Sequence, residues 1–187
     1  MKILNIMKKL FFSLSIYILF ISNSFSQELI IGEERIEPGI ILIFEGAIKD
    51  HITPISMHLS ESLTNVHIEA RVNWGSDNIP NGAPSEGFVP YLNITATITN
   101  QNSGLLTFID LKPHVNLVDN FHYARNISLP GKINELYTVK FNISPPTGVD
   151  LAIHKDWLKK YGKQLISNYS FEYKNINFNE IASAKRN

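Results

Sequence analysis

A ten-residue stretch of the chain, residues 65–74, alternates apolar and polar side chains without a break. Successive side chains of a β-strand point to opposite faces, so this stretch is predicted to be a strand with one apolar and one polar face. The apolar face is predicted to belong to the core, and the polar face to be open. The core set is Val66, Ile68, Ala70, Val72 and Trp74, and the polar set is His67, Glu69, Arg71 and Asn73.

His67 and Glu69 are two residues apart on the predicted polar face, which is roughly 7 Å along a strand that rises about 3.4 Å per residue. An imidazole and a carboxylate are ligands for iron, copper, zinc or manganese. The two side chains can therefore converge on one ion or on two adjacent ions. An ordinary half-exposed strand shows the same alternation, so this stretch alone leaves both interpretations open.

Several other segments also have strand character, and few have helical periodicity. Residues 75–87 are rich in Gly, Pro, Asn and Ser and are predicted to be a long loop, while residues 112–123 are expected to be irregular. Strands at this spacing predict an all-β sandwich with long loops and one short helix. The further predicted strands are 40–48, 88–100, 105–111, 137–143 and 168–178, and the predicted helix is 155–165.

The composition excludes several classes of protein. The 187 residues argue for one domain, and the formal net charge of zero gives no reason to expect a nucleic-acid partner or an anionic membrane surface. The chain has no cysteine, which excludes disulfides, thiolate zinc sites and iron–sulfur clusters. It also lacks a nucleophile elbow, a Walker loop, a dinucleotide fingerprint and paired zinc-protease histidines, so no enzymatic activity is expected.

The N-terminus is typical of a secretory signal peptide. Basic residues precede an apolar run from Leu10 to Ile21, and a stretch of small residues follows. The apolar run is shorter than the roughly 20 residues that a membrane-spanning helix needs. Cleavage is predicted near Ser26, which leaves an exported protein without a stable membrane anchor; an uncleaved N-terminal anchor is the alternative. The predicted organisation is a signal peptide over 1–26, one domain over 27–180 and a frayed tail over 181–187.

All six histidines lie between residues 51 and 154. Because the chain has no cysteine, a metal site would be built from histidine and carboxylate, with Met57 as a further candidate. A single histidine is more often structural or solvated, and a sequence does not show which histidines converge. The six are His51, His58, His67, His114, His122 and His154.

Six stretches in a fixed order, spanning about residues 31–173, resemble the bacterial periplasmic high-affinity ferrous-iron transport protein family. The pair His-x-Glu-Ala before Phe-x-Pro-Tyr-Leu, with His-Tyr later, is the most specific part of this resemblance. The stretches are Ile31–Glu33, Pro54–Met57, Val66–Ala70, Gly87–Leu92, His122–Ile127, and His154 with Tyr169–Lys174 behind it.

The resemblance implies an immunoglobulin-like sandwich that carries a cluster of three histidines, one glutamate and one methionine. The first histidine and the glutamate fall on His67 and Glu69, and the later histidines on His122 and His154. The family's methionine follows a proline upstream of His-Tyr, where this chain has Pro113 and His114. His114 is therefore predicted to replace the thioether, which weakens selectivity for Cu(I) because imidazole suits Cu(II), Zn(II) and Fe(II). Accessory candidates are Met57, His58, Tyr123 and Arg125.

The function implied by the resemblance is that of a periplasmic homodimer that binds a divalent metal ion, iron and/or copper with zinc as a further option. It would take part in high-affinity Fe²⁺ uptake with an inner-membrane iron permease. Two alternatives remain open: a periplasmic copper or zinc carrier or buffer, and a β-sandwich that binds a protein or glycan without metal. The native metal and the number of ions per site are also open.

Overall fold

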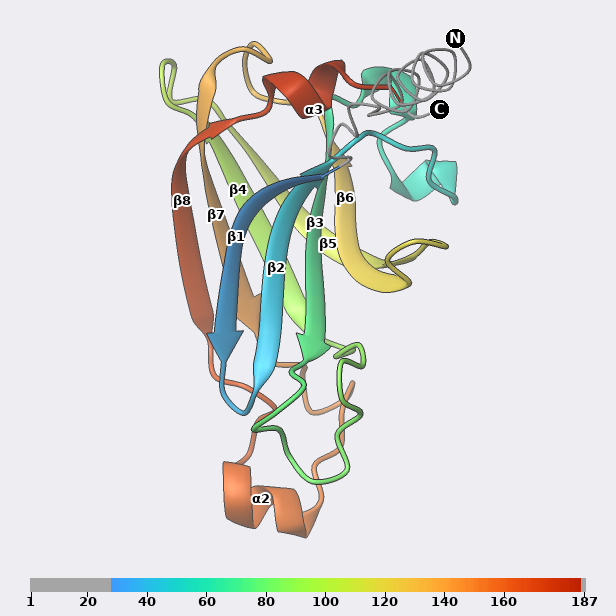
Figure 1. Cartoon of the computed structure of the whole chain (residues 1–187), viewed down its shortest axis with the longest axis vertical. Coiled ribbons are helices and arrows are strands. Elements are labelled where there is room, and N and C mark those ends of the chain that lie inside the picture. Colours follow the sequence, from blue (N-terminus) through green and yellow to red (C-terminus); the bar gives the residue numbers. More distant parts are fainter. Residues whose placement is uncertain (1–27, 186–187) are drawn as a thin grey trace, which may run out of the picture.

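The computed structural model describes residues 28–185, which form eight strands and four short helical segments (Figure 1). The predicted all-β class is confirmed, whereas the predicted signal peptide over 1–26 lies outside the described residues. The strands are β1 (Glu28–Ile36), β2 (Ile40–Ala47), β3 (Val66–Trp74), β4 (Asn93–Asn100), β5 (Leu106–Val115), β6 (Phe121–Ile127), β7 (Leu136–Ser144) and β8 (Tyr169–Asn177). The helical segments are η1 (Ile55–Met57), η2 (Glu61–Leu63), α2 (Lys155–Tyr161) and α3 (Asn179–Ser183).

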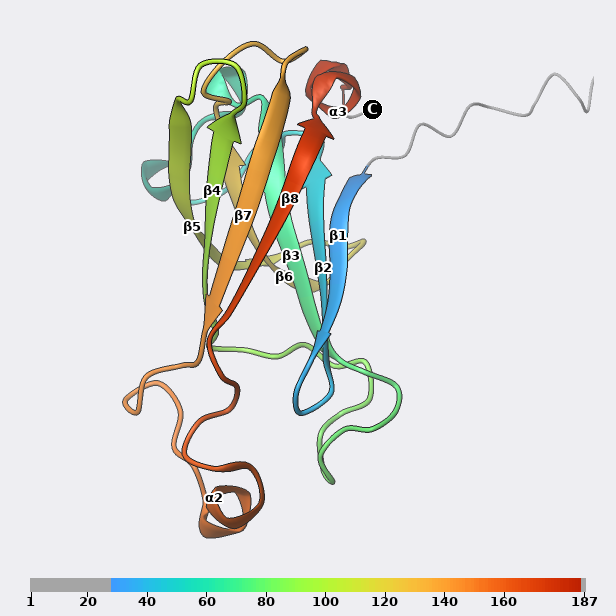
Figure 2. The same cartoon turned by 90° about the vertical axis from the view of Figure 1, so that its left-hand side faces the viewer.

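The strands form one antiparallel sheet that folds over into a nearly closed sandwich. Its strand order is β1-β2-β3-β6-β5-β4-β7-β8. Figure 2 shows two layers, with β4, β7 and β8 in one and β1, β2, β3 and β6 in the other. The two end strands of the sheet approach each other. A hydrogen bond of 2.9 Å joins them, in which the Tyr173 hydroxyl of β8 donates to Glu34 Oε1 of β1.

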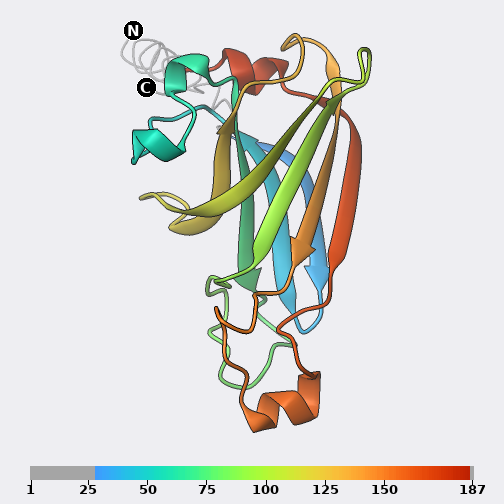
Figure 3. The same cartoon turned by 180° about the vertical axis from the view of Figure 1, so that it is seen from behind.

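Strand β5 passes from one layer to the other. Its first part, Leu106–Leu111, pairs with β4, and its last part, Lys112–Val115, pairs with β6. Figure 3 shows the strand crossing the sandwich toward the hairpin loop that leads into β6. The change of partner brings the last residues of β5 beside β6. Because β6 also pairs with β3, the three strands lie next to one another.

Alternating residues of both layers fill the core. Phe44 of β2 stacks on Phe141 of β7 with ring centroids 4.1 Å apart, and both side chains are 0% exposed. The predicted core face of β3 is confirmed, because all five of its apolar residues are buried. Burial of these residues drives the two layers together.

The predicted open face of β3 is wrong for two of its four residues. His67 and Glu69 are each only 3% exposed. The connection between β2 and β3 and the last part of β5 cover this end of the strand, since both line one cavity with His67 and Glu69. Strand alternation predicts which side chains share a face, but it does not predict what packs on that face.

Three other expectations also need correction. The segment 112–123, expected to be irregular, contains the end of β5 and the start of β6. The tail expected to fray from residue 181 is ordered in α3, where Ile181 is buried in the core. The predicted helix over 155–165 ends at Tyr161. Within the described residues, no helix is long and apolar enough to cross a membrane.

We expect Phe141→Ala to lower the free energy of unfolding by about 3–5 kcal/mol, because it removes a stacked ring from a fully buried site. Phe108→Ala is the matched control, since Phe108 is 63% exposed and should change stability by less than about 0.5 kcal/mol. Chemical denaturation of both variants measures the difference. Equal losses would show that the Phe44–Phe141 stack is not central to the core.

Candidate metal centre

The register of three neighbouring strands places the candidate ligands on one face. His67 lies opposite Asn126, and Glu69 opposite Ala124, in the pairing of β3 with β6. His114 of β5 lies opposite His122 of β6. Directly opposed side chains of an antiparallel pair point to the same face. The crossing of β5 between layers therefore adds His114 to the face that β3 and β6 already share.

Three imidazoles converge on this face. His67, His114 and His122 each offer a nitrogen, and these atoms all lie within 4.8 Å of one another. The centroid of the His114 ring lies 5.3 Å from that of the His67 ring and 5.8 Å from that of the His122 ring. Nitrogens bound to one ion at about 2.1 Å lie about 3.4 Å apart in a tetrahedral arrangement. Binding an ion would therefore need only a small inward movement of the rings.

Glu69 provides a carboxylate at the same place. Its Oε1 lies 3.5 Å from His67 Nε2, and its Oε2 is buried without a hydrogen-bond partner among the described residues. Burial is the main reason that the pKa of Glu69 is raised to about 8, and the nearby charges of Asp119, Glu45 and Glu28 add to it. A buried, unpartnered oxygen is costly unless a proton or a cation satisfies it. This donor set fits a metal ion.

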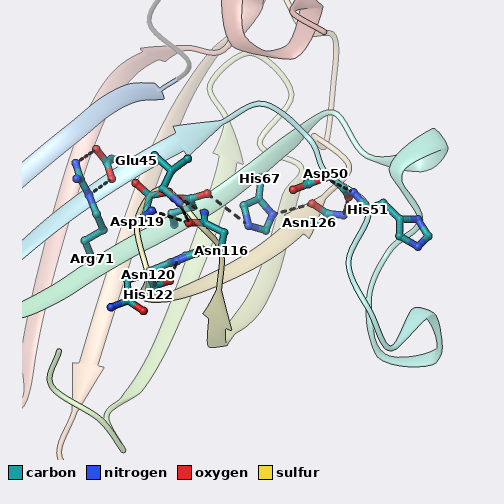
Figure 4. A network of polar contacts seen from close by, with 12 residues as sticks. Glu45, Asp50, His51, His67, Arg71, Asn116, Asp119, Asn120, His122 and Asn126 are labelled. Atoms are coloured by element: carbon teal, nitrogen blue, oxygen red, sulfur yellow. Dashed lines mark hydrogen bonds and ion pairs between the residues drawn. The ribbon is translucent and has the colours of Figure 1, made fainter. Parts of the chain in front are cut away.

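Hydrogen bonds fix the orientation of two of the rings. His67 Nδ1 lies 2.7 Å from Asn126 Oδ1, and the Asn126 amide nitrogen donates to the carbonyls of Asp50 and Leu59 (Figure 4). Since these carbonyls settle which atom of the amide is the oxygen, His67 Nδ1 is the donor, and Nε2 is the nitrogen left to bind a metal ion when the ring is neutral. His122 likewise directs Nδ1 to the Asn120 carbonyl over 3.1 Å. Such contacts hold metal-binding imidazoles in one tautomer and orientation.

His114 has no such partner. Its Nε2 is buried and makes no hydrogen bond within residues 28–185. Burial lowers the pKa of His114 to about 3, and the neighbouring histidines contribute in the same direction. Burial also lowers the pKa of His122. Both rings are thus held neutral, which is the state that binds a metal ion.

His58 approaches the cluster from the connection between β2 and β3. Its ring centroid is 5.0 Å from that of His114, and its Nδ1 is a further buried nitrogen that lacks a partner among the described residues. Met57 lines the same cavity but is largely exposed. The sequence could suggest His58 only as an accessory candidate, because the path of an irregular connection leaves no periodic signal.

Tyr123 and Arg125, the other accessory candidates, have separate contacts. The Tyr123 hydroxyl is buried on the core side, where it donates to the Val89 carbonyl and accepts from the Leu92 amide. The pKa of Tyr123 is raised to about 12, chiefly by burial. Arg125 lies 3.8 Å from Asp110, and its charge is among the causes that lower the pKa of His114. Neither residue offers a ligand atom to the cluster.

His154 is not brought to the cluster within one chain. It is exposed and immediately precedes α2. Figure 1 shows α2 beyond the end of the sandwich where β3 finishes, whereas His67 lies near the start of β3. Of the five predicted ligands, the fold thus gathers His67, Glu69, His114 and His122.

Comparison with protein families matches residues 25–179 to the Fe²⁺ transport protein family. The chain belongs to this family. A comparison with curated proteins gives no match.

Solved structures with the same fold include members that hold copper. A copper-bound variant of the P19 protein of Campylobacter jejuni is 26% identical, has a TM-score of 0.67, and is matched over 79% of this chain and 96% of its own. Copper-reconstituted P19 gives 26% identity and a TM-score of 0.66, with 79% and 94% covered. FetP of the uropathogenic Escherichia coli strain F11 shares the fold at 23% identity and a TM-score of 0.63, with 81% and 98% covered.

We expect the metal-free Fe²⁺ transport family protein to lose stability as the pH rises from about 5 to about 8.5, because the folded state holds the Glu69 proton more strongly than the unfolded state does. Below the ordinary pKa of a glutamate, the carboxyl is neutral in the folded and the unfolded state, and its titration does not change the stability. Above about pH 8 it is charged in both states, and the full free-energy cost of the buried charge is present. Glu69→Gln should remove this part of the pH dependence. Chemical denaturation with a chelator present, at several pH values, measures it.

Glu33→Gln is the matched control for this experiment, because Glu33 is exposed. It should leave the pH dependence as it is in the wild type. A Glu69→Gln curve that runs parallel to the wild-type curve would contradict a raised pKa at Glu69.

Proposed function

We propose that the protein captures a divalent metal ion in the cluster of His67, Glu69, His114 and His122 and passes it to an inner-membrane permease in iron uptake. Membership of the Fe²⁺ transport protein family supports a role in iron uptake. The observation that carries the proposal is the cluster itself: three converging histidines beside a buried carboxylate oxygen that lacks a partner in the described residues. The protein binds and releases the ion and catalyses no reaction.

The ligand set suits iron and copper, and also zinc. Imidazole binds all three metals, and the carboxylate of Glu69 adds a hard oxygen that favours iron. By the Irving–Williams order, Cu(II) and Zn(II) should bind more tightly than Fe(II). Availability of each metal, rather than affinity alone, then decides which ion occupies the site.

The place of action that we propose is the periplasm, after removal of the signal peptide near Ser26. The basic start and short apolar run of residues 1–26 support export. A family member that handles iron between an outer supply and an inner-membrane permease has to act on that side of the membrane.

A periplasmic copper or zinc carrier or buffer is the second candidate function. The observation that favours it is His114, whose imidazole lies within the cluster where the family resemblance implies a thioether. The two functions differ in the metal that the protein holds in its own cell. Metal analysis of protein purified from its own periplasm separates them, and protein without stoichiometric metal would overturn both.

His122→Ala should weaken the binding of every divalent ion by about 10-fold or more, because it removes a buried ligand. His114→Met should instead raise the affinity for Cu(I) relative to Zn(II), since only the soft ion benefits from sulfur. Competition titrations with Cu(I), Cu(II) and Zn(II) measure both effects. If His114→Met leaves all three affinities unchanged while His122→Ala abolishes binding, His114 is not a ligand.

We also propose a homodimer with its metal sites near the interface. The long loop 75–87 and the exposed apolar residues Val115, Leu117 and Val118 of the β5–β6 hairpin offer contact surface. A dimer is also the route by which His154 can reach a cluster, namely that of the other copy. Sedimentation of residues 27–187 at tens of micromolar should give a dimer, and a monomer under all conditions would count against this assembly.

A further inference from the structure

We propose that His58 and His114 form an outer metal-binding position, through which a divalent cation enters and leaves the buried cluster. This inference rests on the proposed metal binding and adds a route for the ion. The route runs from the cavity mouth, past the His58–His114 pair, to His67, His122 and Glu69.

The burial of the histidines changes along this cavity. His67 and Glu69 are 3% exposed and His122 is 2% exposed, so an ion bound to them is closed off from solvent. His58 and His114 are half-buried, and His51 and Met57, which line the same cavity, are exposed. An ion that comes from solvent on this side meets the half-buried pair before it meets the buried ligands.

The spacing of the His58 and His114 rings is compatible with two ligands of one ion. The ring centroids are 5.0 Å apart and the ring planes meet at 81°. Two imidazoles on one tetrahedral ion have centroids about 5 Å apart, given metal–nitrogen bonds of about 2.0–2.1 Å. His58 Nδ1 and His114 Nε2 are both buried without a partner in the described part of the chain. The same spacing is common in edge-to-face ring pairs. The two unpartnered nitrogens, which are rare for buried polar groups, are therefore the observation that points to a ligand.

His114 is the ring that connects the outer and the inner positions. Its centroid lies 5.0 Å from that of His58, 5.3 Å from that of His67 and 5.8 Å from that of His122. No hydrogen bond from either neighbouring strand holds its Nε2. The ion can therefore remain bound to His114 while it exchanges His58 for His67 and His122.

Asn126 connects the outer position to the inner one. Its amide nitrogen donates to the carbonyls of Asp50 and Leu59, at the two ends of the segment that carries His58. The same amide accepts from His67. The segment that brings His58 to the cavity is therefore held by the group that orients an inner ligand.

The test is the rate of metal exchange in the mature protein, residues 27–187, with Zn²⁺ and Cu²⁺ as the probes. Stopped-flow transfer of the ion to and from a chromophoric chelator gives the rates of uptake and release. His58→Ala should slow both rates by about tenfold, which is the effect of raising the barrier by about 1.4 kcal/mol. The equilibrium affinity should change much less, because the inner ligands remain.

His51→Ala is the matched control, since His51 is exposed and lines the same cavity. It should exchange metal at the wild-type rate. His58→Gln keeps a polar side chain of similar size without the imidazole and should behave like His58→Ala. The thermal midpoints of these variants establish that each is folded, and His58→Gln replaces His58→Ala if the latter is not.

Each outcome decides the proposal. Exchange at the wild-type rate in both His58 variants would overturn it. A large loss of affinity with an unchanged uptake rate would make His58 a ligand of the inner cluster and would also overturn it. If the wild type binds neither ion, the proposed function itself fails. If the wild type and the His58 variants all bind the ion and exchange it at the same rate, only the outer position is overturned.

Discussion

The side-chain amide of Asn126 is the contact on which the metal centre depends. It accepts a hydrogen bond from His67 and donates to the carbonyls of Asp50 and Leu59. These bonds satisfy backbone groups of the connection between β2 and β3 and hold this connection over the polar face of β3. The alternation of β3 supplies the ligands, but it is this cover that buries them and raises the pKa of Glu69. A sandwich with the same strands and an open connection would present solvated side chains.

Burial of the ligands destabilises the metal-free protein. The charged residues nearby differ in how far their own burial is compensated. Next to the cluster, Glu45 is fully buried and pairs with Arg71 through two hydrogen bonds. The Glu45 carboxylate thus has a cationic partner, whereas Glu69 Oε2 has no partner in the described chain. A bound cation would satisfy this oxygen and would be held by three imidazoles. The fold therefore keeps one carboxylate oxygen without a partner among the described residues, beside imidazoles that can bind a cation.

The sequence predicts the strands and one face of the site, because these depend on periodicity. The parity of residues 66–74 correctly places five core residues and puts His67 beside Glu69. It fails where the answer depends on elements that are distant in sequence. The connection over β3 makes the open face a buried one, and it alone brings in His58. Residues 112–123 show no regular alternation and include Pro113, so no strand is expected there. The strand β5 nevertheless continues into this segment by changing its partner from β4 to β6.

The fold gathers four of the five ligands that the family resemblance implies, and this suits a protein that must also release its ion. Here three buried side chains, His67, Glu69 and His122, are fixed by strands, while His114 lacks a hydrogen bond at Nε2. His154 lies at the far end of the sandwich and closes no site in its own chain. Ligands fixed by strands give affinity, and at His114 no hydrogen bond to Nε2 in the described chain has to break when the ion leaves.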